Sequence, residues 1–298
     1  MRKNKYLFIV LLSLALLMAA CAASKKDAII SSESGKASYI AETEQQPQSK
    51  NTKYTNIKPI NSVARENKPT YKIVQETYTV NDARSDITIN YPQVVGLSDN
   101  ERQNRINELI RKEAVLLSLP GRPASDERLL TVRSDYQIAW QSNNLLCIQY
   151  RGYIYVKGAP YSPDHLMITN IDIAKGDKLM LKDLVVIDED FAKIFRNDNI
   201  RTVSPLSGTF TGKQVFVEFT PLNSVDDTVK RLKSADEVYS KGRSGTYCYF
   251  TPNAFGISTG VAHAIGDHAE FEIRYEDLAK HIKVDNEVWK DFFTGVGK

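Results

Sequence analysis

Short stretches of alternating apolar and polar residues dominate the chain between residues 70 and 275. Residues 145–156 show the pattern most clearly, with Leu146, Ile148, Tyr150, Ile154 and Val156 on one side and Gln149, Arg151, Tyr153 and Tyr155 on the other. A period of two is typical of β-strands. We therefore expect strands over residues 71–80, 86–91, 134–140, 145–156, 166–173, 178–181, 214–220, 245–250, 255–257 and 269–275.

Helical spacing of apolar residues is confined to a few segments. Ser98 and Glu101 have the spacing of a capping box, which predicts a helix with Ile106, Leu109 and Ile110 on its apolar stripe. Further helices are expected over 188–196, over 224–239 and around Trp289, Phe292 and Phe293. Runs of strands with few helices predict an α+β protein with antiparallel sheets.

Two residues are expected to interrupt or turn the chain. Pro92 should end the strand over 86–91, because proline cannot donate to a β-ladder. The tetrapeptide 174–177 should form a hairpin turn, with Gly176 at the position that needs a positive φ.

The first 21 residues have the pattern of a secretory signal. Arg2, Lys3 and Lys5 precede an apolar run over residues 6–20, and Cys21 follows a pair of alanines. A cysteine at this position is typical of bacterial lipoproteins, in which its thiol is acylated. The alternatives are a plain signal peptide or an uncleaved anchor, although 15 apolar residues fall short of the roughly 20 that span a bilayer.

Composition divides the rest of the chain. Residues 21–69 are polar and aperiodic, so we expect a disordered tether. Two small antiparallel-sheet-plus-helix domains in tandem should follow it. The expected organisation is a signal over 1–20, the tether over 21–69, a first α+β domain over 70–170 and a second over 171–298.

Charge and cysteine content narrow the classes of function. Removing the signal removes three basic residues and no acidic one, which leaves equal numbers of basic and acidic residues. Such a chain lacks the basic character of nucleic-acid-binding proteins. Cys147 and Cys248 lack metal-ligand spacing, and they are either two buried thiols or one disulfide.

Several segments together resemble a known pair of uncharacterised domains. The pair occurs N-terminal to the catalytic domain of certain peptidoglycan deacetylases and in the extracellular part of lysozyme-sensing anti-sigma factors. The resemblance covers roughly residues 70 to 285 and rests on Ile87-Thr-Ile-Asn-Tyr-Pro-Gln-Val-Val-Gly96, Tyr150-Arg-Gly-Tyr-Ile-Tyr155, Asn170-Ile-Asp172, Leu181-Lys-Asp-Leu184, Tyr249-Phe-Thr-Pro252, Ala262-His-Ala-Ile-Gly-Asp267 and Ile273-Arg-Tyr-Glu-Asp-Leu278.

The chain departs from both groups in ways that matter for function. Only five residues precede the apolar run, so we expect no sigma-binding segment, and we expect no deacetylase domain after residue 285. Residues 157–163 also replace the Gly-Gly-Ala-His-type turn of many family members. The resemblance therefore implies a stand-alone envelope module that binds or senses a wall glycan or a lysozyme-type protein.

Two catalytic or metal-binding interpretations compete with this one. Residues 256–260 match the Gly-x-Ser-x-Gly pattern of hydrolases, so Ser258 with His263 could cleave ester or acetyl groups. A metal could be bound by His263, Asp267 and His268. The two histidines, however, have neither the spacing of one helix face nor that of one strand face. We expect no metal and no cofactor.

The best binding candidates are aromatic. Tyr153 and Tyr155 lie beside Arg151 on the polar side of their strand, and Tyr161 follows in the next turn. Tyrosine and arginine are strong interface anchors, and tyrosine rings stack on sugars. A second interpretation is that these rings pack in a core.

We expect a membrane-anchored, extracytoplasmic binding module without nucleic-acid partners, while a structural envelope or spore-assembly role stays open.

Cys21 provides the first test. Cys21→Ser should abolish incorporation of a labelled fatty acid and release the protein from the membrane fraction, because the acylated thiol is the expected anchor. The measurement is metabolic labelling followed by fractionation. Equal labelling of the variant would contradict lipidation at this residue.

Overall fold

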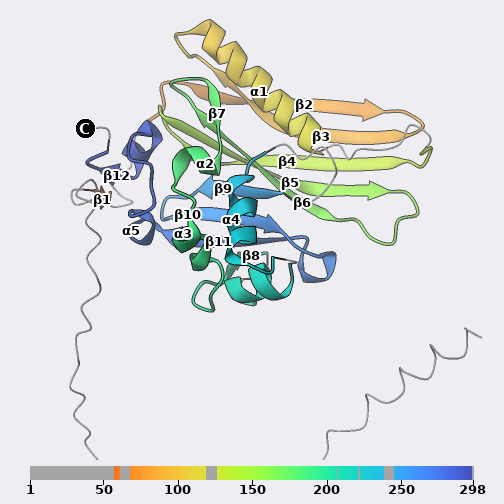
Figure 1. Cartoon of the computed structure of the whole chain (residues 1–298). Coiled ribbons are helices and arrows are strands. Elements are labelled where there is room, and N and C mark those ends of the chain that lie inside the picture. Colours follow the sequence, from red (N-terminus) through yellow and green to blue (C-terminus); the bar gives the residue numbers. More distant parts are fainter. Residues whose placement is uncertain are drawn as a thin grey trace, which may run out of the picture. The chain divides into compact units, whose positions relative to one another are not determined.

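The computed structural model describes residues 57–60, 68–118, 126–205, 207–220, 222–237 and 245–296, all within one compact unit over Lys50–Lys298. The expected signal, Cys21 and most of the expected tether lie outside these residues. The described part is an α+β structure with two main sheets, as the sequence predicts (Figure 1). None of its helices is long and apolar enough to cross a membrane. The boundary expected at residue 171 falls inside a strand of the first sheet, and the division into two domains remains a prediction.

The first sheet has six strands in the order β2-β3-β4-β5-β6-β7. These strands are β2 (Lys72–Asn81), β3 (Ser85–Val95), β4 (Leu130–Gln141), β5 (Leu145–Val156), β6 (Asp164–Asp172) and β7 (Asp177–Leu179). Every pair is antiparallel except β3–β4, which the helix α1 (Asn100–Ser118) connects. A crossover helix is the usual connection between parallel strands. In this structure α1 packs against β3, β6 and β7.

The second sheet has four antiparallel strands in the order β8-β11-β10-β9. They are β8 (Thr202–Ser204), β9 (Thr246–Phe250), β10 (Ala254–Gly260) and β11 (His268–Arg274). Strand β9 contacts β4, β5 and β6, and β11 contacts β6. The helical segments nearby are α2 (Leu181–Leu184), α3 (Glu189–Ile194), the π-helix η3 (Gln214–Glu218) and α4 (Val225–Lys233).

Buried rings and one buried carboxylate join the C-terminal segment to both sheets. Trp289 and Phe292 flank the ring of Phe250 in β9, and Phe292 also contacts Trp140 of β4. Asp291 accepts hydrogen bonds from Trp140 Nε1 at 3.0 Å, from Asn144 Nδ2 at 2.7 Å and from Ser142 Oγ. The remaining short elements are β1 (Lys58–Pro59), which pairs with β12 (Phe293–Thr294), the 3-10 helices η4 (His263–Ile265) and η5 (Glu287–Asp291), and α5 (Tyr275–Leu278).

Three local expectations are wrong. Pro92 does not end its strand, because β3 leaves β4 after Ile89 and the proline nitrogen then needs no partner on that side. The N-cap of α1 is Asp99 and not Ser98, since Asp99 Oδ1 accepts the Arg102 N–H at 3.0 Å. Residues 214–220 form η3 and a turn instead of a strand, which buries the adjacent Val215 and Phe216 together.

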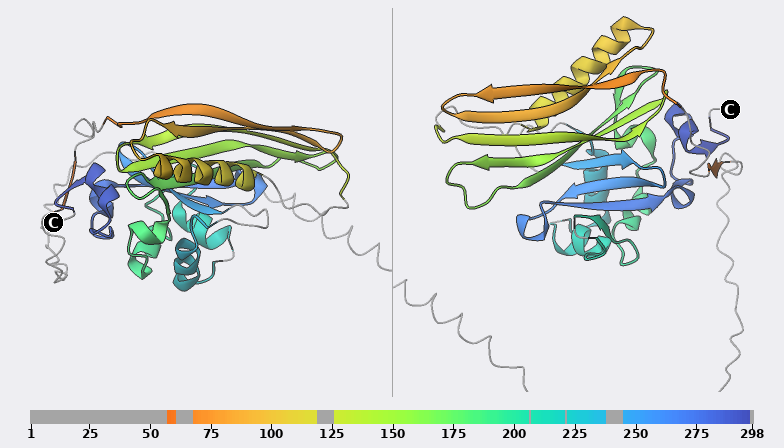
Figure 2. Two further views of the ribbon diagram at one scale, coloured as in Figure 1. Left: turned by 90° about the horizontal axis from the view of Figure 1, so that it is seen from above. Right: turned by 180° about the vertical axis from the view of Figure 1, so that it is seen from behind.

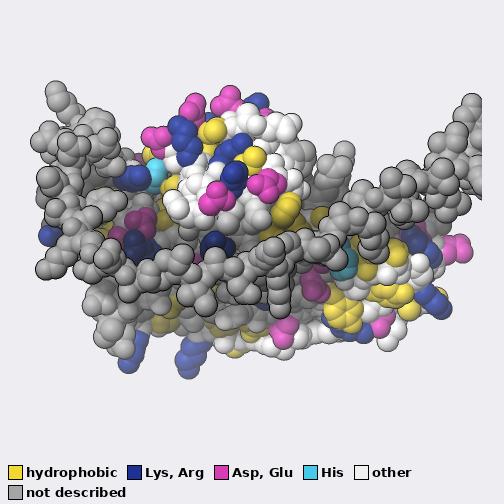
Figure 3. All heavy atoms as spheres, turned by 90° about the horizontal axis from the view of Figure 1, so that it is seen from below, with side chains coloured by type: hydrophobic (Ala, Val, Ile, Leu, Met, Phe, Trp, Pro, Cys, Tyr) yellow, Lys and Arg dark blue, Asp and Glu magenta, His cyan; other side chains and the backbone are white. Residues whose placement is uncertain are grey.

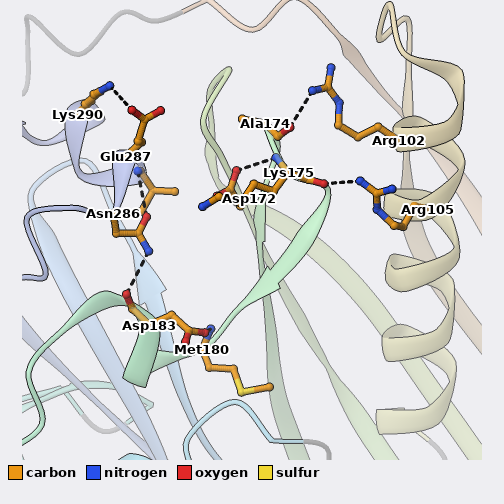
Figure 4. A network of polar contacts seen from close by, with 11 residues as sticks. Arg102, Arg105, Asp172, Ala174, Lys175, Met180, Asp183, Asn286, Glu287 and Lys290 are labelled. Atoms are coloured by element: carbon orange, nitrogen blue, oxygen red, sulfur yellow. Dashed lines mark hydrogen bonds and ion pairs between the residues drawn. The ribbon is translucent and has the colours of Figure 1, made fainter. Parts of the chain in front are cut away.

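Other local expectations are confirmed. Cys147 and Cys248 are buried free thiols. The start of the helix expected over 224–239 is confirmed, because Ser224 is the N-cap of α4, whereas the helix ends at Lys233. Gly176 has a φ of +76° in the β6–β7 turn, where two arginines of α1 approach it. Figure 4 shows Arg102 and Arg105 reaching the carbonyl groups of Ala174 and Lys175.

Gly176→Ala should lower the free energy of unfolding by about 1–2 kcal/mol, because the left-handed backbone disfavours a Cβ. The added Cβ would also lie 2.9 Å from Arg102 Cγ and disturb the arginine contacts. Gly158→Ala is the matched control, since Gly158 has a φ of +86° but no atom within 4 Å of an added Cβ. Chemical denaturation should show the larger loss for Gly176→Ala, and equal losses would contradict the steric argument.

Candidate ligand-binding face

The second sheet covers only part of one face of the first. Strand β5 is buried on both sides over residues 145–150, whereas residues 151–156 are partly exposed. We call the uncovered part the open face and define it by Thr88, Asn90, Arg133, Arg151 and Tyr153, whose strand positions place them on one side of β3, β4 and β5. Tyr153 is 38% exposed and lies opposite Arg133 and Asp164 in the sheet. The open face is therefore polar, with an aromatic ring at its surface.

Arg151 lies where the two sheets separate. Its Nη1 and Nη2 donate to the two carboxylate oxygens of Glu270 in β11, each at 3.1 Å, and Nη2 also donates to Gln149 Oε1 at 3.1 Å. Glu270 is buried, while the Arg151 side chain is 40% exposed. This two-point geometry fixes the guanidinium at the edge of the open face.

The environment of Glu270 favours its charged form. Burial alone would raise the pKa of this carboxyl, but the contacts from His268 and Arg151 outweigh burial and lower the pKa to about 2. The His268 Nε2 atom lies 3.3 Å from Glu270 Oε1. Glu270 is therefore a fixed negative charge that positions Arg151, and it lacks the pKa of a general acid.

The open face contains a hollow of about 230 Å³. Its lining comprises Thr88, Asn90, Arg133, Ser134, Asp135, Arg151, Gly152 and Tyr153. Arg133 Nη2 donates to Asp86 Oδ2 at 2.6 Å, which holds this second guanidinium in place. A Cβ on Gly152 would lie 1.9 Å from the Arg133 carbonyl oxygen, so only glycine allows β4 and β5 to approach here. The hollow thus offers hydrogen-bond donors and acceptors beside one ring.

A second exposed aromatic residue, Tyr161, lies in the turn that leads into β6, the strand that pairs with Tyr153. The ring of Tyr161 stacks on His263 with centroids 4.1 Å apart and an interplanar angle of 7°. His263 Nδ1 lies 2.9 Å from Asp267 Oδ2. The same carboxylate oxygen accepts the Asp164 N–H at 2.9 Å. Asp164 lies opposite Tyr153 in the sheet. The Asp164 N–H therefore links the strand pair that carries Tyr153 to Asp267, which holds His263. No pattern in the sequence predicts the contact between Tyr161 and His263.

The remaining candidate residues have structural surroundings. The Tyr155 hydroxyl accepts the Gly158 N–H at 3.3 Å and supports the turn after β5. Ser258 is 1% exposed in the middle of β10, between Tyr247 and Glu270. A hydrolase nucleophile needs a strand-to-helix turn that exposes the serine, and the surroundings of Ser258 lack one. His263 is held by Asp267, and no bond between His263 and Ser258 occurs in the described residues.

Metal-binding geometry is also absent from the described part of the chain. No group of three potential ligand residues comes together there. His268 lies beside Glu270, whereas His263 contacts Asp267 and Tyr161.

Positive and negative side chains are interspersed on the described parts of the surface in Figure 3.

The strand pattern alone does not identify four residues that line the hollow, Thr88, Asn90, Arg133 and Asp135. Their signal was present, because each is a polar residue at an alternate position of a strand. Placing them beside Tyr153 required the pairing of β4 with both β3 and β5.

Comparison with known proteins gives structural similarity alone. No family model and no curated protein matches the chain. A member of the DUF3298 family from Bacteroides fragilis is similar in structure, with 13% identity, a TM-score of 0.48 and coverage of 75% of this chain and 98% of that one. A DUF3298 family protein from Pseudomonas aeruginosa has 15% identity, a TM-score of 0.39 and coverage of 72% and 93%.

Glu270 predicts a pH dependence of stability. Its pKa is lowered from 4.5 to about 2, so its stabilising effect is complete above pH 4.5 and is lost as the pH falls toward 2. Glu270→Gln should remove about 2 kcal/mol of this dependence. The measurement is the free energy of unfolding between pH 2.5 and 7 for both proteins. Glu287→Gln is the control at an exposed carboxyl, and parallel curves for wild type and Glu270→Gln would contradict the argument.

Proposed function

We propose that the chain is a non-enzymatic, lipid-anchored binding module outside the cytoplasm, and that its open face binds a glycan of the cell wall. The observation that carries this proposal is the hollow beside Tyr153. The guanidinium groups of Arg133 and Arg151, each fixed by a carboxylate, lie there with amide and hydroxyl side chains and the exposed Tyr153 ring. Sugars are bound by such combinations, because their hydroxyls need polar partners and their C–H faces stack on aromatic rings.

The geometry supports an extended ligand better than a small enclosed one. Tyr153 lies opposite Asp164 in the sheet, and Asp267 binds both the Asp164 N–H and the His263 ring of the stacked Tyr161–His263 pair. A polymer could contact both aromatic groups, whereas a single small molecule in the hollow would contact Tyr153 alone. The sequence resemblance adds the expectation of a wall glycan, and Cys21 supplies the expected anchor.

Tyr153→Ala should weaken binding to purified peptidoglycan about tenfold, because it removes a stacking ring worth roughly 1–1.5 kcal/mol. Phe219→Ala is the matched control, since Phe219 is 39% exposed and Tyr153 is 38% exposed. Saturation binding of the full chain to insoluble peptidoglycan gives the dissociation constants. Equal effects of the two substitutions would contradict a site on the open face.

A parallel measurement with lysozyme separates the other expected ligand. Saturable binding to lysozyme but not to peptidoglycan would overturn the proposal that the ligand is a glycan. The proposal that the chain is a binding module would still hold. Saturable binding to neither would overturn both.

The hydrolase alternative predicts a different result. Ser258→Ala and His263→Ala should abolish the turnover of a model ester if these residues are catalytic. Because Ser258 is buried in β10, we expect the wild-type protein to show no turnover above background. Turnover that both substitutions remove, with unchanged melting temperatures, would contradict our proposal.

A further inference from the structure

Strand β2 forms an open margin of the first sheet. It is the terminal strand in the sheet order, and Figure 2 shows it as the outermost strand beside β3. All ten residues of Lys72–Asn81 are exposed or half-buried. In the described part of the chain, no strand pairs with its outer edge.

The pairing of β3 shows which backbone groups of β2 point outward. The Asn107 side chain binds both the Val94 N–H, at 2.7 Å, and the Val94 carbonyl, at 2.9 Å, on the side away from β2. Val94 and its partner Ile73 are therefore a non-hydrogen-bonded pair. By alternation, the free N–H and carbonyl groups of β2 belong to Ile73, Gln75, Thr77, Thr79 and Asn81. Pro92, which has no N–H, lies opposite Gln75 and agrees with this assignment.

Strand β2 has few of the features that usually protect an edge. Its ten pairs with β3 run without a bulge, and it contains no proline. Lys72 and Glu76 are its only charged residues, and Val74 is 42% exposed. Long, regular edges of this kind are templates for pairing with another strand.

We propose that β2 pairs antiparallel with β2 of a second copy of this chain, around a two-fold axis at Thr77. Outward groups must face outward groups, so a residue of β2 pairs only with partners of the same parity. With the axis at Thr77, Lys72 lies opposite Asp82, the first residue after β2 in the second copy, and Val74 lies opposite Val80. The same register places Glu76 opposite Tyr78 and forms about ten backbone hydrogen bonds.

The neighbouring allowed registers fit less well. An axis at Glu76 places this carboxylate opposite its own copy, and an axis at Tyr78 places Val74 opposite Asp82. An axis at Gln75 places Val74 opposite Glu76. Opposite charges and apolar pairs stabilise facing positions, whereas like charges destabilise them. Charge complementarity and the fit of Val74 to Val80 therefore favour a second copy as the partner.

The main test reverses one charge at the proposed contact. Lys72→Asp places two like-charged pairs in each dimer, so the dimer dissociation constant of the full chain with Cys21→Ser should rise about tenfold. Adding Asp82→Lys should restore it to within about threefold. Lys157→Asp is the control, because it makes the same charge change in the exposed turn after β5. Asp82 also accepts the Arg84 N–H, so the melting temperature of each variant is measured.

A second test is independent of charge. Thr77→Pro removes an N–H that faces the outer edge, so it should abolish the dimer without breaking a backbone hydrogen bond between β2 and β3. It also removes the hydrogen bond from Thr77 Oγ1 to Asn90 Oδ1 of β3, at 2.8 Å, and Thr77→Val, which removes that bond alone, should keep the dimer. Thr77→Cys should form a disulfide-linked dimer under mild oxidation, whereas Lys157→Cys should not. Sedimentation equilibrium that shows a monomer, or a dimer indifferent to Lys72→Asp and Thr77→Pro, would overturn the proposal.

Discussion

The ion pair between Arg151 and Glu270 determines where the two sheets meet and where they separate. A carboxylate that is 3% exposed needs a close partner, and Arg151 supplies two hydrogen bonds from the neighbouring sheet. On one side of this pair β5 is buried and contacts β9 of the second sheet. On the other side the same strand is partly exposed and carries Tyr153. The pair therefore fixes the boundary between the core and the open face.

This boundary explains which parts of the fold the sequence predicts. Alternation identifies β5 and β11 correctly, and helical spacing identifies α1 and α4. The same rules fail where long-range pairing decides the structure. Pro92 is tolerated because β4 has already diverged, and residues 214–220 become helical because Val215 and Phe216 must be buried together. Neither condition can be derived from the local sequence.

The candidate site shows a similar limit. The alternation in β5 places Tyr153 and Tyr155 on one side of the strand, where they are either an exposed binding surface or part of a second packed layer. In the structure the Tyr155 hydroxyl supports a turn, and Arg151 is held by Glu270, more than a hundred residues away in the chain. The stacking of Tyr161 on His263 depends on the turn around Asp267, which has a positive φ of 64°. Contacts between distant turns have no signature in strand periodicity.

The central claim is that the uncovered half of β5 binds a wall glycan. Hydrogen–deuterium exchange of the full chain with and without soluble peptidoglycan fragments tests this most directly. We expect slower exchange over residues 130–135, 151–155 and 161–165, and unchanged exchange over α3 and α4. Protection confined to other segments, or no protection at saturating fragment concentration, would contradict the account.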